Sequence, residues 1–195
     1  MFGLDARIAL AIFGALSVIT GAALYGAMKE AKVVALITEF DNIDKAVTEY
    51  LLNTGSYPPA DTTNATVTNY GYLNIKELIT STASSWSGPY LKYNSGANTY
   101  FLDHPNYGNA YLYRNQDSDW DTPSLTSTTC LSGSTSCSIY ICIDSLTEDI
   151  SKALDLKIDG VAGSNKGSLR YYNNGTFTCK KGMPYDKSLS PASIP

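Results

Sequence analysis

Residues 8–27 read IALAIFGALSVITGAALYGA, a run of twenty residues without a charged side chain. As an α-helix rising 1.5 Å per residue, this run is about 30 Å long, which is the thickness of a bilayer's hydrocarbon core. A secretory signal peptide fits less well, because its apolar region is only about 7–15 residues long and follows a basic segment. Residues 1–7 instead carry one acid, Asp5, and one base, Arg7. The run therefore predicts a helix that lies in lipid or among other apolar helices.

The helical pattern continues after the apolar run but becomes one-sided. From residue 28 to residue 54, apolar side chains recur every three or four positions and charged side chains lie largely on the other face. The sequence GSYPP at residues 55–59 then ends the helix. We therefore predict one helix over residues 1–54, with an all-apolar part at 1–27 and an amphipathic part at 28–54. A globular head follows at residues 55–195.

Short strands and turns dominate the head. A sequence resembling a capping box predicts a short helix over residues 74–82, and a second one predicts a helix that begins at residues 145–148 and ends near Gly160. Segments rich in β-branched and aromatic residues predict strands over 100–102, 110–113 and 138–143, and a hairpin of 168–172 with 176–180 around an Asn-Asn-Gly turn. The predicted fold class is α+β, with the long helix packed on a small antiparallel sheet.

Four cysteines, Cys130, Cys137, Cys142 and Cys179, lie in the second half of the chain among Ser, Thr and Gly residues. This usage predicts disulfides formed in an oxidising compartment. In a strand over 138–143, Cys137 and Cys142 point to opposite faces and lie about 16 Å apart, beyond the roughly 7 Å that a disulfide tolerates. Of the two remaining pairings we favour Cys130–Cys137 with Cys142–Cys179, and the pairing that contains Cys137–Cys179 stays open.

The composition argues against several classes of protein. The formal net charge is −4 and only 16% of the residues are charged, whereas a nucleic-acid-binding body needs a basic face. The single histidine, His104, precedes a proline and is expected to be a turn residue. No G-x-S-x-G motif and no phosphate-binding glycine motif occurs. We therefore expect neither an enzyme nor a bound cofactor.

Three acidic residues, Asp117, Asp119 and Asp121, alternate as calcium ligands do in a binding loop. Trp120 and Thr122 stand where such a loop has glycine, however, and no glutamate follows at the required distance. A solvated acidic loop is therefore favoured over a calcium site, and we expect no bound metal.

Several features together resemble the type IV pilin and type II secretion pseudopilin superfamily. The apolar helix begins a few residues after an acid at position 5 and ends in YLLNTGSYP at residues 50–58. The segments WSGPYL at residues 86–91 and DHPNYGNAY at residues 103–111 resemble a turn region of major pseudopilins. The resemblance implies a long N-terminal helix packed on a sheet, with a structural role as a filament subunit.

The resemblance also implies roles for individual residues. Met1 would be the mature, N-methylated terminus left after a prepilin peptidase removes a leader, and Asp5 would pair with the terminus of a neighbouring subunit. The family usually has glutamate at that position, and the nearby Arg7 could itself neutralise Asp5 between subunits. Alternatively, both charged residues simply flank a membrane anchor. Gly14 and Gly21 are expected to let the helix loosen within a filament, since glycine weakens helices.

The expected function is a major pilin of a type IV pilus or pilus-like extracellular filament on a bacterial surface. Its partners would be copies of itself in a helical filament, the inner membrane before assembly, and a prepilin peptidase, an assembly ATPase and a platform protein. One alternative is the major pseudopilin of a type II secretion system. The other is a membrane-anchored periplasmic binding or adhesion module. The disulfides favour a pilus, whereas residues 86–91 and 103–111 favour a pseudopilin ancestry.

Overall fold

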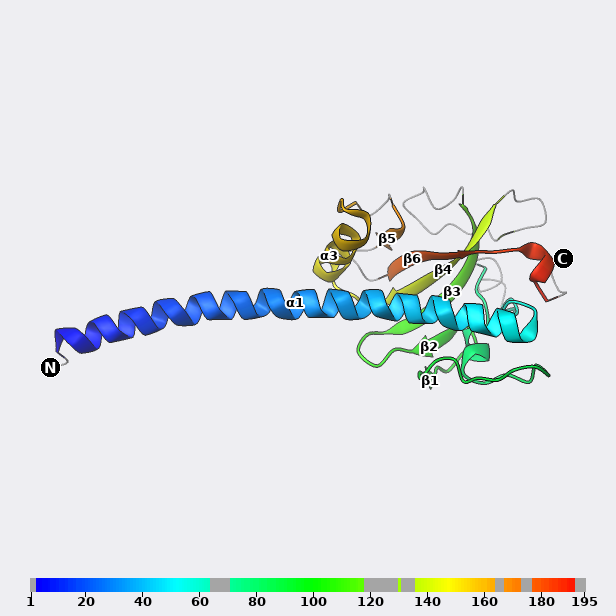
Figure 1. The fold of residues 1–195 in the computed structure, drawn as a ribbon, viewed down its shortest axis with the longest axis horizontal. Coiled ribbons are helices and arrows are strands. Elements are labelled where there is room, and N and C mark those ends of the chain that lie inside the picture. The colour runs from blue at the N-terminus through cyan, green and yellow to red at the C-terminus, as the bar shows by residue number, and fades with distance from the viewer. Residues whose placement is uncertain are drawn as a thin grey trace.

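The fold consists of one very long helix and a single antiparallel sheet, seen in a computed structural model (Figure 1). The structure describes residues 3–63, 71–117, 130, 136–163, 167–172 and 177–191. This arrangement confirms the predicted α+β class, with a long N-terminal helix and two disulfides in the C-terminal region.

Helix α1 (Leu4–Thr54) runs without interruption for 51 residues. It ends where the sequence predicts, because Gly55 adopts a left-handed conformation with φ 76° and its N–H donates to the carbonyl of Leu51. In Figure 1 the first half of α1 projects away from the head as a bare rod, and the second half lies across the sheet. The two halves of one helix therefore have different surroundings.

The sheet has six strands in the order β1-β2-β3-β4-β6-β5, and all neighbouring strands are antiparallel. The strands are β1 (Asn94–Ser95), β2 (Phe101–Asp103), β3 (Asn109–Gln116), β4 (Cys137–Asp144), β5 (Leu169–Tyr172) and β6 (Phe177–Pro184). Helix α3 (Glu148–Asp159) follows β4 and packs against α1, and two short 3-10 helices are η1 (Ile75–Leu78) and η4 (Lys187–Leu189). The turn predicted between β5 and β6 lies outside the described residues.

The core lies between the second half of α1 and one face of the sheet. Strand β4 alternates as its sequence predicts: Ile139, Ile141 and Ile143 join the main core, whereas Tyr140 and Cys142 belong to a second cluster on the other face. The residues that α1 buries in the main core are spaced by three or four positions, namely Val33, Leu36, Phe40, Ile43, Ala46, Val47 and Tyr50. This packing fastens the helix to the head.

The helix after β4 begins within the predicted range of residues 145–148, but Ser145 is not its N-cap. The N-cap of α3 is Thr147, whose hydroxyl accepts from the N–H of Ile150, and the helix begins at Glu148. Ser145 has a φ of 62° and its hydroxyl donates to the carboxylate of Asp144. The left-handed backbone conformation of Ser145 therefore lies outside the helix, which begins three residues later.

The helix predicted over residues 74–82 forms only in part, as the 3-10 helix η1 over Ile75–Leu78. The carbonyls of Glu77 and Leu78 would continue a helix, but they accept from the indole N–H of Trp86 and the backbone N–H of Tyr90. The side chain of Asn74 makes no capping bond to the backbone. Tertiary hydrogen bonds thus replace the helical ones in this segment.

Candidate assembly surface

The first half of α1 is an exposed apolar surface. Ten large apolar side chains between residues 8 and 28 are exposed by 50–74%: Ile8, Leu10, Ile12, Phe13, Leu16, Val18, Ile19, Leu24, Tyr25 and Met28. A monomeric soluble protein rarely exposes so large an apolar surface. The helix is also long and apolar enough to cross a membrane. The first half of α1 is therefore suited to lipid or to other apolar helices.

The hydroxyl groups in this segment do not require water. Ser17 donates to the carbonyl of Phe13 at 2.8 Å, and Thr20 donates to the carbonyl of Leu16 at 2.9 Å. Because a polar group in hydrocarbon is costly unless it is hydrogen-bonded, these bonds within the helix suit an apolar environment.

The two charged residues near the start of α1 are exposed and do not pair with one another. Asp5 and Arg7 are two positions apart, a spacing at which helical side chains do not face each other. Neither side chain forms an ion pair with another described residue. Both charges therefore remain available to a second molecule. Met1 lies outside the described residues.

The glycines of the apolar segment lie in regular helix. A Cβ atom added at Gly14 or Gly21 would meet nothing within 4 Å, so no close approach within this chain requires glycine there. Helix α1 is continuous through both positions. The predicted loosening concerns helices packed in a filament and stays a prediction.

Ion pairs hold the middle of α1 against α3 and β6. They join Lys29 to Asp149 at 2.7 Å, Glu30 to Lys157 at 2.6 Å, and Asp41 to Lys180 at 2.5 Å. All three involve at least one well-exposed side chain, and such pairs contribute little stability individually. The first two pairs lie where α1 meets α3, and the third lies where α1 meets β6.

A buried contact on the other side of α1 could not be predicted from the sequence. The imidazole Nε2 of His104 lies 2.8 Å from a carboxylate oxygen of Glu39, and the hydroxyl of Tyr93 donates to the other oxygen. The Nδ1 atom of His104 accepts from the backbone N–H groups of Asn106 and Tyr107, so His104 also forms the predicted turn. Partial burial raises the pKa of Glu39, but the contacts with His104 and Tyr93 outweigh burial and hold this pKa below its usual value.

The structure joins Cys130 to Cys137 and Cys142 to Cys179, which is the pairing favoured from the sequence. Cys142 and Cys179 stand directly opposite each other on β4 and β6, with their Cα atoms 4.0 Å apart. The Cα atoms of Cys130 and Cys137 are 5.9 Å apart. One disulfide thus joins the neighbouring strands β4 and β6, and the other joins Cys130 to the first residue of β4.

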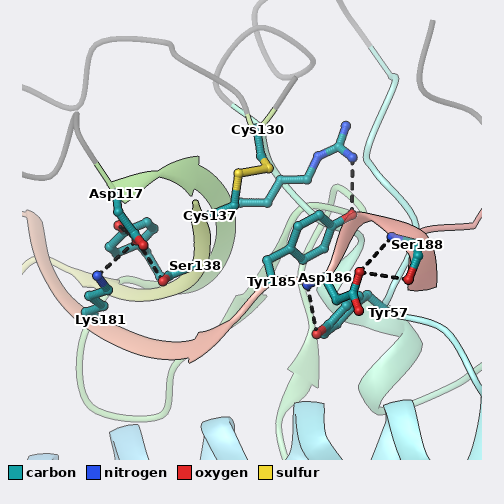
Figure 2. Close-up of a disulfide and its surroundings, with 11 residues drawn as sticks. Tyr57, Asp117, Cys130, Cys137, Ser138, Lys181, Tyr185, Asp186 and Ser188 are labelled. Carbon is teal, nitrogen blue, oxygen red and sulfur yellow. Dashed lines mark hydrogen bonds and ion pairs between the residues drawn. A yellow bond between two sulfur atoms is a disulfide. The ribbon is translucent and has the colours of Figure 1, made fainter. Parts of the chain in front are cut away.

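The C-terminal segment is fastened beside the Cys130–Cys137 disulfide (Figure 2). The backbone N–H of Tyr185 donates to the carbonyl of Cys137, and its ring lies 4.6 Å from that of Tyr57, measured between centroids. Tyr57, just after α1, donates to the carbonyl of Pro184. These contacts tie the end of the long helix to the end of the sheet.

Asp117 is engaged in bonds within the head. One carboxylate oxygen accepts from the hydroxyls of Ser138 at 2.7 Å and Tyr140 at 3.0 Å, and lies 2.9 Å from the ammonium group of Lys181 (Figure 2). Burial raises the pKa of Asp117, but the bonds with Lys181, Ser138 and Tyr140 outweigh burial and lower it. In the sequence, Asp117, Asp119 and Asp121 alternate as in a calcium-binding loop. Asp119 and Asp121 lie outside the described residues.

Comparison of the chain with known protein families, curated proteins and solved structures finds no match. The fold must therefore be described from the structure of this chain alone. A long N-terminal apolar helix packs on an antiparallel sheet that carries two disulfides. These features are compatible with a pilin-like fold.

Proposed function

We propose that this protein is a structural subunit of a filament of the type IV pilus kind. The observation that carries the proposal is the contrast within α1, whose side chains are exposed over residues 8–28 and buried on one face over residues 33–50. The head already has a closed core without the first half of the helix. That half is therefore free to pack in a membrane first and among copies of itself later.

Burial of the apolar surface would hold the filament together. Removing a Leu, Ile or Phe side chain from water stabilises an assembly by about 1.5–3 kcal/mol, and seven of the ten large exposed side chains belong to these three types. Lipid removes the same surface from water, so transfer from the bilayer to the filament needs a further contribution. In this proposal that contribution comes from helix packing, from pairing of Asp5 and from an energy-consuming assembly machine.

A second candidate function is a membrane-anchored binding module. The same apolar helix supports it, because one such span is enough to anchor a protein. The continuity of α1 favours the filament, since a single unbroken helix couples the apolar half rigidly to the head. An anchor alone needs no such rigid connection.

Electron microscopy of the material sheared from cells that express the full chain tests the proposal. The expected result is thin filaments whose main protein, identified by mass spectrometry, is this chain. Retention of the chain in the membrane fraction, with no filaments, would support the anchored module instead. A secretion defect without surface filaments would favour the pseudopilin among filament subunits.

A further inference from the structure

An exposed apolar tip lies where α3 ends. Leu156 is 56% exposed and Val161 is 75% exposed, and the neighbouring Ala162 is exposed as well. Gly160, in the left-handed conformation, ends α3 between Leu156 and Val161. We call Leu156, Val161 and Ala162 the α3 tip.

A groove runs along the other side of α1. It consists of two cavities of about 410 and 420 Å³ that share Glu39 as a lining residue. One wall is α1 itself, including Asn42, and the other wall is formed by residues 90–93 and 105–107. We call this surface the α1 groove. Each cavity has room for an aliphatic side chain.

Helix α3 and the α1 groove lie on different sides of α1. Figure 1 shows α3 on one side of α1 and strands β1 and β2 on the other. Accordingly, Lys29 and Glu30 of α1 contact α3, whereas Glu39 and Asn42 line the groove. Two such surfaces on different sides of one subunit suit a head-to-tail contact, which produces an open array when its rotation does not close into a ring.

The charges of the two surfaces are complementary. Helix α3 carries three acids that are not buried, Glu148, Asp149 and Asp159, against two lysines, Lys152 and Lys157, whereas its fourth acid, Asp155, is buried. The groove is lined by three lysines, Lys32, Lys45 and Lys92, against two glutamates, Glu39 and Glu49. His104 and Tyr93 already engage Glu39. The acidic flank of one copy would therefore approach the basic flank of another, which favours this pairing over contact between like flanks.

The axial positions also suit a staggered array. Helix α3 contacts α1 at Lys29 and Glu30, and the groove is centred near Glu39 and Asn42. The separation is about ten residues, or about 15 Å along the helix. A neighbour shifted by this distance along α1 would place its α3 tip at the level of the groove.

We propose that the α3 tip of one copy docks in the α1 groove of the next copy. This inference rests on the proposed filament function and names the contact between heads that would accompany packing of the apolar helices. The tip supplies the apolar contact, and the lysines of the groove face the acids of α3.

Cysteine crosslinking in sheared filaments tests the contact. The full chain would carry Val161→Cys together with Asn42→Cys; the four native cysteines are already paired, so they offer no thiol. Mild oxidation should convert the monomer into a ladder of dimers and larger multimers on a non-reducing gel. The matched control combines Val161→Cys with Leu52→Cys, an exposed position of α1 beyond the groove, and should remain monomeric.

The outcomes separate the inference from the function on which it rests. Filaments without a Val161–Asn42 ladder overturn the docking contact and leave the filament function intact. If the unmodified chain forms no filaments, the filament function itself fails. If the added cysteines prevent assembly, the filament yield of Val161→Lys tests the docking contact, with Val161→Ile as the control. A lysine at this position would lie beside the lysines of the groove, so we expect the yield to fall several-fold. An unchanged yield overturns the contact.

Discussion

At the scale of single residues, Asp155 shows how a charge can oppose the fold that contains it. Its side chain is buried on α3, and one carboxylate oxygen accepts from the N–H of Gly163. Burial, and next the nearby Asp159, raise the pKa of Asp155 to about 6 despite this bond. The folded head therefore prefers the protonated form of this residue.

Replacing Asp155 with asparagine should therefore stabilise the head at neutral pH. Between about pH 4 and pH 6 the native state binds more protons at this group than the unfolded state, so its contribution to stability falls as pH rises. Asp155→Asn keeps an acceptor for Gly163 and has no charge to bury. The free energy of unfolding of the variant should match that of the parent near pH 4 and exceed it by about 1–3 kcal/mol at pH 7. Denaturant titrations at both pH values measure this difference. Equal differences at the two pH values would contradict a raised pKa of Asp155.

Asp5 is expected to act in assembly and not in the fold. It lies on the exposed rod far from the core, so Asp5→Ala should leave the melting temperature of the head unchanged. An unpaired carboxylate in an apolar surrounding costs several kcal/mol, so the filament must pair it. Without the charge that pairing is lost, and we expect filament yield to fall more than about tenfold, a factor that corresponds to 1.4 kcal/mol. Asp5→Glu is the control and should still assemble, whereas normal yield from Asp5→Ala would remove the pairing role.

At the scale of elements, the two halves of α1 should respond differently to the same type of substitution. Phe40 is fully buried against the sheet, and Leu16 is 56% exposed. Phe40→Ala should lower the free energy of unfolding of the head by about 3–5 kcal/mol. Leu16→Ala should change it by less than about 0.5 kcal/mol. Chemical denaturation of both variants in detergent measures the contrast, and a similar loss in both would mean that the apolar half belongs to the core of the head.

The two disulfides should contribute unequally to stability. Cys142–Cys179 spans a sequence separation of 37 residues, and Cys130–Cys137 spans only 7. The chain-entropy relation predicts about 4 kcal/mol for the longer loop and about 2.5 kcal/mol for the shorter one. The double variant Cys142→Ala with Cys179→Ala should therefore unfold more easily than Cys130→Ala with Cys137→Ala. Thermal melts of the two double variants compare them, and the reverse order would show that loop length does not govern their effect.

At the scale of the whole molecule, the features predicted from the sequence are those with local signals. The helix is predicted because apolar spacing continues to residue 54 and a glycine-proline segment follows, and the two faces of β4 follow from simple alternation. Strand β1 is only two polar residues long and exists through its pairing with β2, so no local pattern marks it. The contact of His104 with Glu39 likewise depends on how the sheet lies against the helix.

The same contrast between local sequence signals and tertiary contacts applies to the exposed apolar surface of α1, residues 8–28, and to the α1 groove. The apolar composition of residues 8–28 and the charges at Asp5 and Arg7 are visible in the sequence, and the structure adds that the whole surface is exposed. The α1 groove brings together α1 and residues 90–93 and 105–107, so it exists only in the folded head. Surfaces formed by one segment were therefore predictable, and surfaces formed between segments were not.

The central claim is that the first half of α1 is a specific packing surface and not merely an anchor. Replacing residues 8–27 with an unrelated apolar helix of the same length, built from leucine and alanine, tests it most directly. The claim predicts that the chain still enters the membrane and keeps the melting temperature of its head, but that electron microscopy finds no filaments. Filaments at the yield of the unmodified chain would contradict the claim, because any apolar span would then suffice.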